Sequence, residues 1–395
     1  MSLNPTDIRP ADNKIKGKDF SSPSHLPKLS VYPADQWPRL AKLWSELDEV
    51  SPYSSFYLST EWTNAWLQVF GESLRPEILV FEDENKPIGI CLLVRSTEWR
   101  GPFRVKRIYL NTVGGQIADR TLMEFNNLLC RAGWEEKTSK ALAAHLQSLE
   151  WDEFAVEGIS PGPILSCFLD GNFSVLPPLT SAVPSYYVNL EQLRQSKASY
   201  ESSLSPNTRE QVRRSLKRYA MLGEVRVEVA SELSRAEKLF EEMCGMHQLR
   251  WQEKGEEGAF SPGRRLEFHR TLIRQAFPKG SVQLLRVTAG EETVGILYNF
   301  VKKGKVYFFQ SGFNYRQDKH LKPGLVTHVS AIRYYLDAGF SEYDLLAGDA
   351  QYKRSLARDC RQLDWVVFRR PRVKLVVIER MRGIKRRLRS VIRNA

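Results

Sequence analysis

Three polar residues near the C-terminus, Asp349, Tyr352 and Lys353, have side chains suited to acid–base chemistry. Asp349 can orient or deprotonate an acceptor, and Lys353 can donate to a developing oxyanion or a phosphate. Tyr352 can form a hydrogen bond or protonate a leaving group. The cluster directly follows Tyr343–Leu346, whose aromatic and apolar residues predict a strand. Polar groups just beyond a strand end are where α/β folds build sites, so we expect one here.

The same residues have simpler interpretations. On a helix, Tyr352 and Lys353 point about 100° apart, so they need not share one site. Asp349 can be the N-cap of a short helix from Ala350 to Ala357, a role compatible with catalysis. Gly348, immediately before Asp349, is a candidate substrate-binding residue.

A second candidate site is a predicted helix start at Lys322, Pro323, Gly324 and Leu325. Proline is favoured in the first turn, and apolar residues then recur at helical spacing. The free N–H groups of a helix N-terminus bind anions such as phosphate, and Lys319, His320 and Lys322 add positive charge. The alternative is a proline-started helix with no ligand.

His247 and Trp251 lie one helical turn apart and therefore face the same way. They can form a general base above an aromatic platform for a sugar, but a single His on an amphipathic helix is more commonly a core or interface residue. Gln310 and Asn314 flank the end of a predicted strand, Val306–Gln310, where their amides could bind a donor or an acceptor.

Composition indicates a globular protein of a reducing compartment, which we expect to be the cytoplasm. The 395 residues favour two domains, and the apolar fraction is an ordinary 42%. The five cysteines are scattered without a C-x-x-C pair, which argues against a zinc site and against a disulfide framework. No apolar run is long enough to span a membrane, and the N-terminus has no secretory signal.

The positive charge is concentrated at the C-terminus. Residues 371–395 carry nine Lys or Arg and one acid, Glu379, in a chain of net charge +12. Apolar residues recur through this segment and predict a basic amphipathic helix, a candidate for an anionic membrane surface or an acidic partner. The alternative is a terminal helix that packs on the body of the protein with its basic face in water.

The order of predicted elements repeats along the chain. Each half has two helices, a strand meander, a central strand, a helix and a further strand. In the first half the later helix falls at Ala118–Ala132 or Lys137–Leu149. A joining helix, Ser205–Ala220, has Ser205 as its expected N-cap and Pro206 in its first turn. We expect tandem domains without detectable sequence identity between them.

The motifs form an ordered set. Pro323–Leu325 opens a helix, Gly339–Leu345 reads Gly-x-x-x-aromatic-Asp-hydrophobic, and Ala347–Lys353 ends in Gly-Asp-x-x-Tyr-Lys. In this order they resemble the CelD-like acetyltransferases of bacterial polysaccharide gene clusters, which belong to the GNAT superfamily and are close in fold to Fem-type aminoacyl transferases. The resemblance covers about residues 30–370. Further matches are Trp62, the basic helix Ser205–Lys217, and His247, Trp251, Gly255, Gly258 and Phe260.

The resemblance implies an α/β (α+β) fold of tandem GNAT-like domains, each a mixed, mostly antiparallel sheet flanked by helices. It divides the chain into an N-terminal arm (1–27), a non-catalytic domain (28–190), a catalytic domain that includes helix 205–220 (191–370), and the basic helix (371–395). It implies transfer of an acyl group, acetyl first, from acyl-CoA to an amino sugar or a polysaccharide or cell-envelope precursor, without a metal.

The implied roles divide the candidate residues into three groups. Catalysis falls to Asp349, Tyr352, Lys353 and His247; acyl-CoA binding to Gln310, Lys322, Pro323, Gly324 and Leu325; and acceptor binding to Trp251, Asn314 and Gly348. The chain departs from the family twice. Only Gly324 remains of the usual acyl-CoA loop Arg/Gln-x-x-Gly-x-Gly/Ala, and Ala347 stands where the family often has arginine.

Two other functions remain open. A Fem-like transferase that uses aminoacyl-tRNA would be favoured by a large basic face, since phosphate contacts dominate nucleic-acid binding. A non-catalytic scaffold that recruits a polysaccharide synthase to the inner face of the membrane through residues 371–395 would be favoured by an unoccupied or filled cleft at Gly324.

Overall fold

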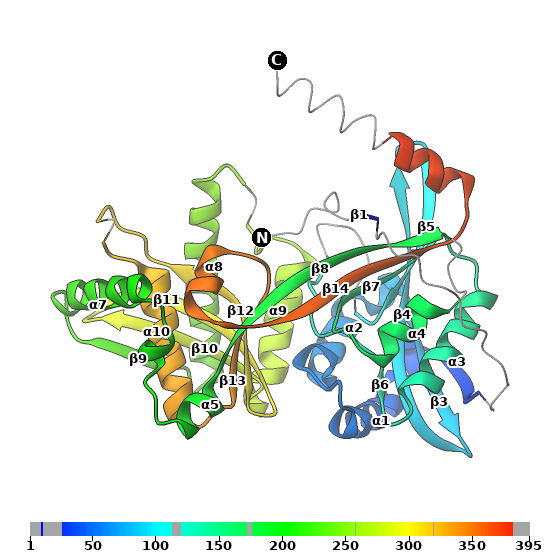
Figure 1. The fold of residues 1–395 in the computed structure, drawn as a ribbon, viewed down its shortest axis with the longest axis horizontal. Coiled ribbons are helices and arrows are strands. Elements are labelled where there is room, and N and C mark those ends of the chain that lie inside the picture. The colour runs from blue at the N-terminus through cyan, green and yellow to red at the C-terminus, as the bar shows by residue number, and fades with distance from the viewer. Residues whose placement is uncertain are drawn as a thin grey trace. The chain divides into compact units, whose positions relative to one another are not determined.

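The structure is a computed structural model that describes residues 9–10, 26–112, 120–171, 176–256, 258–318 and 320–381 (Figure 1). The chain forms two compact units. Unit 1 comprises Met1–Thr60, Phe70–Ala182 and Asp364–Ala395, and unit 2 comprises Glu61–Val69 and Val183–Leu363. The domain limits expected from the sequence stay a prediction. Most of the expected arm 1–27 and residues 382–395 of the basic helix lie outside the described residues.

Unit 1 contains a sheet in the order β2-β3-β4-β5-β7-β14, in which only the pair β5–β7 is parallel. Its elements are β2 (Lys28–Pro33), α1 (Trp37–Val50), α2 (Thr60–Leu74, shared with unit 2), β3 (Glu77–Asp83), β4 (Lys86–Arg100), β5 (Phe103–Leu110), β6 (Leu129–Cys130), α3 (Glu135–Ser148), β7 (Glu153–Ile159) and α4 (Pro163–Asp170). The crossover helix is therefore α3, which confirms the second of the two expected positions. The first, Ala118–Ala132, is wrong because residues 121–128 are irregular and residues 129–130 pair with β4 as β6.

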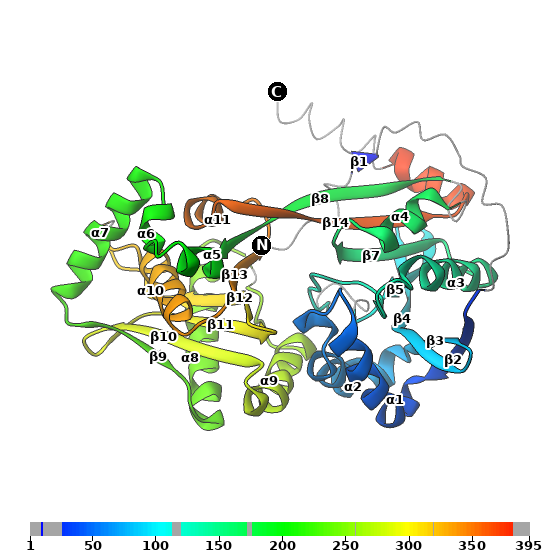
Figure 2. The same cartoon turned by 60° about the horizontal axis from the view of Figure 1, so that its bottom comes forward.

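Unit 2 repeats this arrangement in the order β9-β10-β11-β12-β13-β8, with only β12–β13 parallel. Its elements are β8 (Leu176–Asn189, entering from unit 1), α5 (Leu190–Gln195), α6 (Tyr200–Ser203), α7 (Pro206–Ala220), β9 (Val225–Val229), α8 (Leu233–Gln252), α9 (Arg264–Ala276), β10 (Val282–Ala289), β11 (Glu292–Lys302), β12 (Lys305–Phe313), α10 (Pro323–Asp337), β13 (Glu342–Ala347), α11 (Gln351–Leu356) and β14 (Asp359–Arg369, continuing into unit 1). In Figure 2, α8 and α9 lie on one face of this sheet and α10 lies on the other.

The two parallel strand pairs, β5–β7 and β12–β13, are equally long. Three residue pairs join β5 to β7, beginning at Arg107↔Glu153, and three join β12 to β13, beginning at Lys305↔Glu342. Both first pairs are also ion pairs, at 2.8 Å in unit 1 and 3.9 Å in unit 2. The tandem, mostly antiparallel α/β fold expected from the sequence is therefore confirmed.

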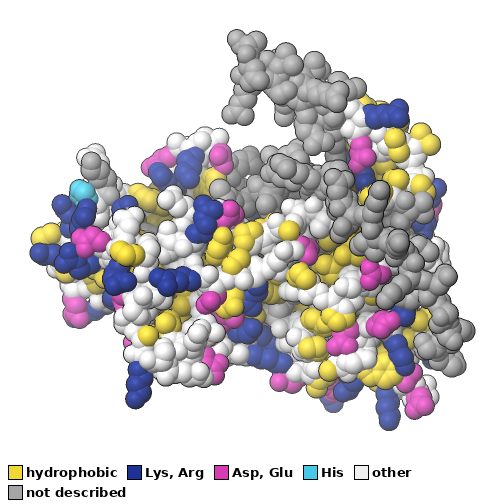
Figure 3. All heavy atoms as spheres, in the orientation of Figure 1, with side chains coloured by type: hydrophobic (Ala, Val, Ile, Leu, Met, Phe, Trp, Pro, Cys, Tyr) yellow, Lys and Arg dark blue, Asp and Glu magenta, His cyan; other side chains and the backbone are white. Residues whose placement is uncertain are grey.

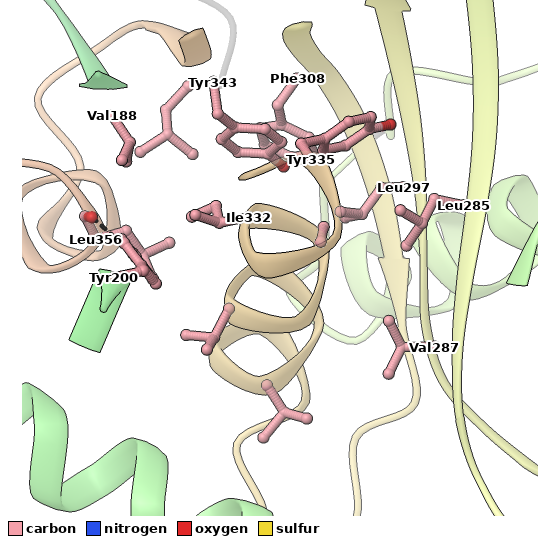
Figure 4. Packing of buried hydrophobic residues seen from close by; sticks show 14 of the residues in the cluster. Val188, Tyr200, Leu285, Val287, Leu297, Phe308, Ile332, Tyr335, Tyr343 and Leu356 are labelled. Atoms are coloured by element: carbon pink, nitrogen blue, oxygen red, sulfur yellow. Dashed lines mark hydrogen bonds between the residues drawn. The ribbon is translucent and has the colours of Figure 1, made fainter. Parts of the chain in front are cut away.

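Helix α10 is the centre of the unit 2 core. Val326, Val329, Ile332 and Tyr335 are buried on it against Tyr343 and other residues of the neighbouring strands (Figure 4). The joining helix α7 begins as expected. Ser205 is its N-cap, and the Ser205 Oγ accepts from the Thr208 N–H at 3.2 Å.

Glycines permit close helix–sheet contacts on both faces of unit 2. A Cβ atom at Gly295 would lie 2.5 Å from Thr327 Oγ1 of α10, and one at Gly312 would lie 2.5 Å from the Met243 carbonyl oxygen of α8. Any larger residue at either position would push its helix away from the sheet.

Gly295→Ala should therefore lower the free energy of unfolding by about 1–3 kcal/mol, because α10 and the ring of Phe313 must both move. Gly245→Ala is the control. Gly245 lies inside α8 with nothing near its absent Cβ, so alanine should raise stability by about 0.5–1 kcal/mol. Urea unfolding of both variants tests this, and equal midpoints would contradict the close-packing argument.

Candidate active site

The parallel strands β12 and β13 separate after a short pairing. Their last paired residues are Tyr307 and Asp344, although β12 continues to Phe313 and β13 to Ala347. A bulge in β12 leaves Phe309 without a partner on β11, because Tyr298 pairs with Gln310 and Asn299 with Phe308. We call the region between Phe308–Phe313 and Leu345–Ala347 the strand divergence. Within the described residues no backbone pairing spans it.

The bend of β13 is held by two buried charged side chains. Leu346 has a left-handed backbone (φ 62°), a conformation that costs a non-glycine residue about 1–2 kcal/mol. Asp344 Oδ1 accepts from the Leu346 N–H at 2.6 Å and from Ser185 Oγ at 3.0 Å. Lys353 Nζ donates to the Leu346 and Ala347 carbonyl oxygens at 2.9 and 2.6 Å. Side chains on both sides of Leu346 thus stabilise the turn that directs β13 away from β12.

Asp344 is fully buried, and that burial raises the pKa of its carboxyl to about 6. Arg361 Nη2, 3.6 Å from Asp344 Oδ2, and the two hydrogen bonds oppose the rise in pKa. Arg361 also pairs with Glu342 at 2.6 Å and lies over the ring of Tyr187. In the sequence, Asp344 stands out only as part of the Gly-x-x-x-aromatic-Asp-hydrophobic motif.

The N-terminus of α10 has two N–H groups without a backbone acceptor among the described residues. The first helical hydrogen bond runs from the Val326 N–H to the Lys322 carbonyl at 3.1 Å, so the N–H groups of Gly324 and Leu325 have no acceptor within the helix. Lys322 is the N-cap, without a capping side chain, and its N–H donates to Ser215 Oγ of α7 at 3.0 Å. An anion placed at this end of α10 would receive N–H donors and the positive end of the helix dipole.

Tyr352 lies on α11 against a histidine that the sequence analysis missed. Its ring stacks on His328 of α10, with 5.8 Å between ring centroids, and its side chain is partly exposed. His328 is buried, and its Nδ1 lies 3.1 Å from Tyr343 Oη. Burial, assisted by the nearby Lys353 charge, lowers the pKa of His328 to about 3, so the ring is neutral. The sequence does contain a signal for His328. It lies four residues after Gly324 on the same predicted helix, so the two residues share one face of that helix.

Asp349 lies at the surface just beyond β13. Its Oδ1 accepts from Tyr186 Oη at 3.0 Å and pairs with Arg354 at 2.7 Å. The N-cap of α11 is Ala350, which has no side-chain cap, so the interpretation of Asp349 as a helix cap is wrong. Gly348 precedes it with a positive φ of 125° and donates its N–H to the Pro184 carbonyl.

Lys353 points away from Tyr352, as expected for adjacent helical residues. It is buried, and the contacts of its ammonium with the two β13 carbonyls are those of a structural support. Its predicted role in stabilising an oxyanion stays a prediction.

His247 is bonded on both sides of its ring. Its Nδ1 lies 3.2 Å from the Ser311 carbonyl, and its Nε2 accepts from the Ala259 N–H at 3.2 Å. Burial lowers its pKa to about 4, and the rings of Trp251 and Phe260 lie beside it. These contacts join α8, β12 and the loop before α9, so the geometry favours the core interpretation. Catalysis by His247 stays a prediction.

The other candidate residues lie at the ends of β12 and α10. Asn314 Nδ2 donates to the Thr293 carbonyl at 3.1 Å, and Gln310 Oε1 accepts from the Ser311 N–H at 3.1 Å. Pro323 is buried in the first turn of α10, and Gly324 and Leu325 are partly exposed. The structure thus brings together the start of α10, the end of β13 and α11, while His247 and Trp251 lie on α8, on the opposite face of the sheet (Figure 2).

Unit 1 has the same strand divergence, but its own chain fills it. Asn126 forms a parallel bridge with Ile159 of β7, and its Nδ2 donates to the Leu110 carbonyl of β5 at 3.1 Å. Asn111 Nδ2 in turn donates to Asn126 Oδ1 at 2.7 Å. Helix α3 also places two acids, Glu135 and Glu136, in its first turn, where they would repel a phosphate. Both features support the prediction that unit 1 is catalytically silent.

Comparisons with known proteins agree with this geometry. Residues 206–354 match the family model described as an acetyltransferase (GNAT) domain. The crystal structure of FemX is similar to this chain, with a TM-score of 0.55 and 9% identity over 82% of this chain and 95% of FemX. The structure of L-PGS from Bacillus licheniformis has a TM-score of 0.46 and 10% identity, over 74% of this chain and 85% of that one. Comparison with curated proteins gives no significant match.

The family match covers residues 206–354, which lie in unit 2, and supports N-acyl transfer as the activity of this part of the chain. The FemX similarity shows the fold alone at this identity. Within the described ranges, no group of three or more His, Cys, Asp or Glu side chains could hold a metal ion. In the same residues, no helix combines the length and apolar character needed to cross a bilayer.

His269 is the third buried histidine of unit 2. Aromatic rings surround it, the nearest being Phe309 at 4.8 Å and Phe268 at 5.0 Å between centroids. Complete burial lowers its pKa to about 3. Between the ordinary pKa of about 6.5 and pH 3 the unfolded chain binds this proton and the folded chain does not, so stability falls as the pH falls.

His269→Phe should remove that dependence, because phenylalanine keeps the ring contacts and cannot bind a proton. Between pH 6 and pH 4 the free energy of unfolding should fall less steeply than in wild type, by about 1.4 kcal/mol per pH unit. Urea unfolding at several pH values measures the slope. An unchanged slope would show that His269 is protonated in the folded protein.

Proposed function

We propose that the protein transfers an acetyl group from acetyl-CoA to the amine of an amino sugar in a polysaccharide or cell-envelope precursor. The observation that carries the proposal is the strand divergence of unit 2, which lies beside the free N-terminal turn of α10. GNAT domains typically use acyl-CoA as co-substrate, which agrees with this arrangement.

The residues at α10 suit the donor. The N–H groups of Gly324 and Leu325 would hold the pyrophosphate, and the exposed Lys322 would add charge where the usual loop has lost its other positions. Asp318, which precedes the helix, pairs with Arg218 of α7 at 2.6 Å and accepts from the His320 N–H at 2.9 Å. The part of acetyl-CoA that carries the acetyl group would then extend from α10 into the strand divergence.

Asp349 and Tyr352 would complete the reaction from α11 and the end of β13. Asp349 accepts a proton from the acceptor amine as the nitrogen–carbon bond forms. Tyr352 donates its phenolic proton to the thiolate as the carbon–sulfur bond breaks. Neutral His328 holds the Tyr352 ring by stacking. Lys353 and Asp344 act on the backbone that carries Asp349, because both hold the Leu346 turn.

The donor site is tested by two substitutions at one position. A Cβ atom at Gly324 would lie 3.2 Å from the Phe313 ring, so Gly324→Ala measures the effect of that contact alone. Gly324→Glu adds a carboxylate beside the pyrophosphate. By calorimetry Gly324→Ala should weaken acetyl-CoA binding less than tenfold, and Gly324→Glu should abolish it. Equal affinity of a folded Gly324→Glu protein and the alanine variant would exclude the donor from this end of α10.

Catalysis is tested at Tyr352 and Asp349. Tyr352→Phe keeps the stacking on His328, and Asp349→Asn keeps the size of the side chain, so neither should disturb the fold. Each should reduce kcat about 100-fold with acetyl-CoA affinity unchanged, because each removes one proton-transfer group. Arg354→Gln is the control, since it removes only the ion-pair partner of Asp349. Full turnover in Asp349→Asn would exclude Asp349 as the base and would leave bound water as the proton acceptor.

A second candidate donor is aminoacyl-tRNA, as in the Fem-type enzymes that the sequence resembles. The observation in its favour is the outer face of α7, where Arg209, Arg213, Arg214 and Lys217 are exposed. Figure 3 shows Lys and Arg side chains gathered over this helix. Native mass spectrometry with acetyl-CoA, longer acyl-CoAs and charged tRNA separates the two donors. A scaffold role has less support, because no backbone fills the strand divergence of unit 2 in the described residues.

A further inference from the structure

The end of the β4–β5 hairpin has one covered face and one exposed face. On the covered face, Leu375 and Ile378 of the C-terminal helix, residues 373–381 (red in Figure 1), are buried. They pack there against Phe103 and Val105 of β5. For residues 373–381 this confirms the alternative of a helix packed on the body of the protein. The opposite face of the hairpin is therefore the one that remains available to a ligand.

Five exposed side chains form the opposite face. They alternate along the two strands with the side chains of the covered face, since successive residues of a strand point to opposite sides. Trp99 pairs with Arg104 across the hairpin, and Thr97 pairs with Lys106. We call this set the ribbon face: Arg95, Thr97, Trp99, Arg104 and Lys106. It continues the face of the sheet on which α3 packs, and it is the part that α3 leaves uncovered.

Trp99 supplies a flat apolar surface within the ribbon face. It is 68% exposed, and the guanidinium of Arg104 lies 5.8 Å from the centroid of its ring. Arg104 is exposed, and no acid of the described residues forms an ion pair with it. A single exposed tryptophan is not unusual, but one beside a cation without a counter-ion suits a ligand with a flat face and a negative charge.

A cleft of about 280 Å³ opens on the ribbon face next to Thr97. Two ion pairs border it, Lys106 with Glu150 at 2.7 Å and Arg95 with Glu77 at 2.9 Å. All four of these side chains are at least partly exposed. The cleft therefore offers a ligand both N–H donors and carboxylate acceptors. Sugar hydroxyl groups, which donate and accept hydrogen bonds, match such a surface.

We propose that the ribbon face binds a sugar chain that carries carboxylate groups. One sugar ring would stack on Trp99 with its carboxylate at Arg104, and a neighbouring ring would lie in the cleft. A nucleic acid fits less well, because phosphate contacts dominate its binding and Glu77 and Glu150 stand among the cations. A lipid surface fits less well, because Trp99 is the only apolar member of the ribbon face.

The position of this site follows from unit 1 alone, which contains the whole hairpin. The choice of a saccharide rests on the function proposed above, whose acceptor belongs to the same class of molecule. The ribbon face would hold a part of the acceptor chain other than the amino sugar that reacts.

The test is calorimetry of the full chain, without acetyl-CoA, with hexagalacturonate, neutral cellohexaose and single-stranded oligouridylate. The wild-type protein should bind hexagalacturonate most tightly of the three. Trp99→Ala should weaken that binding about tenfold or more, because a stacked tryptophan is commonly the dominant contact of an interface. The control Leu122→Ala, at another exposed apolar residue of unit 1, should bind as wild type.

A charge pair separates the role of Arg104 from that of the ring. Arg104→Gln should weaken hexagalacturonate binding about tenfold and leave cellohexaose binding within about twofold, because only the first ligand has a carboxylate. Lys137→Gln is the matched control. Lys137 also lies beside a tryptophan, 4.8 Å from the ring centroid of Trp134, and its loss should change neither affinity.

Equal hexagalacturonate binding by wild type and Trp99→Ala, or no binding by wild type, would overturn the proposal. Tighter binding of oligouridylate that depends on Trp99 would also overturn it, and so would self-association that Trp99→Ala abolishes. Sugar binding by a protein that transfers no acetyl group would contradict the proposed function alone. Acetyl transfer by a protein whose ribbon face binds no sugar would contradict this inference alone.

Discussion

The left-handed turn at Leu346 is the constraint on which the candidate active site depends. A leucine adopts this conformation only where its surroundings compensate the cost, and here a carboxylate holds its N–H while an ammonium holds its carbonyl. Both side chains are buried, and the charge of each is balanced locally: Asp344 by Arg361, and Lys353 by two carbonyl dipoles. The turn separates β13 from β12 and places Gly348 and Asp349 beyond the strand.

The two units show what happens when this constraint is absent. By register, Ala155 of β7 corresponds to Asp344 of β13, since each is the third residue of its parallel pairing. The methyl side chain of Ala155 cannot accept a hydrogen bond from a backbone N–H, and β7 has no left-handed residue before Gly158. In place of a ligand, unit 1 carries Asn126 between its strands and two acids at the start of α3. The same fold therefore leaves the strand divergence open in unit 2, whereas in unit 1 Asn126 lies between the corresponding strands.

The sequence predicted the features that depend on local pattern. The Pro323-Gly324 helix start, the strand at 343–346 and the Ser205 cap were all visible in spacing and composition, and the structure has α10, β13 and α7 there. The predicted cap at Asp349 failed because α11 begins one residue later, where Asp349 is held by Tyr186 and Arg354 instead. The stacking of His328 on Tyr352 and the clamp on Leu346 could not be predicted, because they join residues of different elements. Lys353 shows the same limit: its residue type suggested chemistry, and only the fold shows that its ammonium contacts backbone carbonyls.

The chain order around β8 and β14 was equally hidden from the sequence. β8 follows β7 along the chain but pairs with β13 in unit 2, and β14 follows β13 but pairs with β7 in unit 1. Val188 of β8 is buried in the core of unit 2, and Val366 and Phe368 of β14 are buried in the core of unit 1. The core of unit 1 therefore includes β14, which follows β13 of unit 2 along the chain. The core of unit 2 includes β8, which follows β7 of unit 1. A cut between residues 190 and 191 would deprive unit 2 of β8 and unit 1 of β14, exposing a strand edge and apolar residues in both.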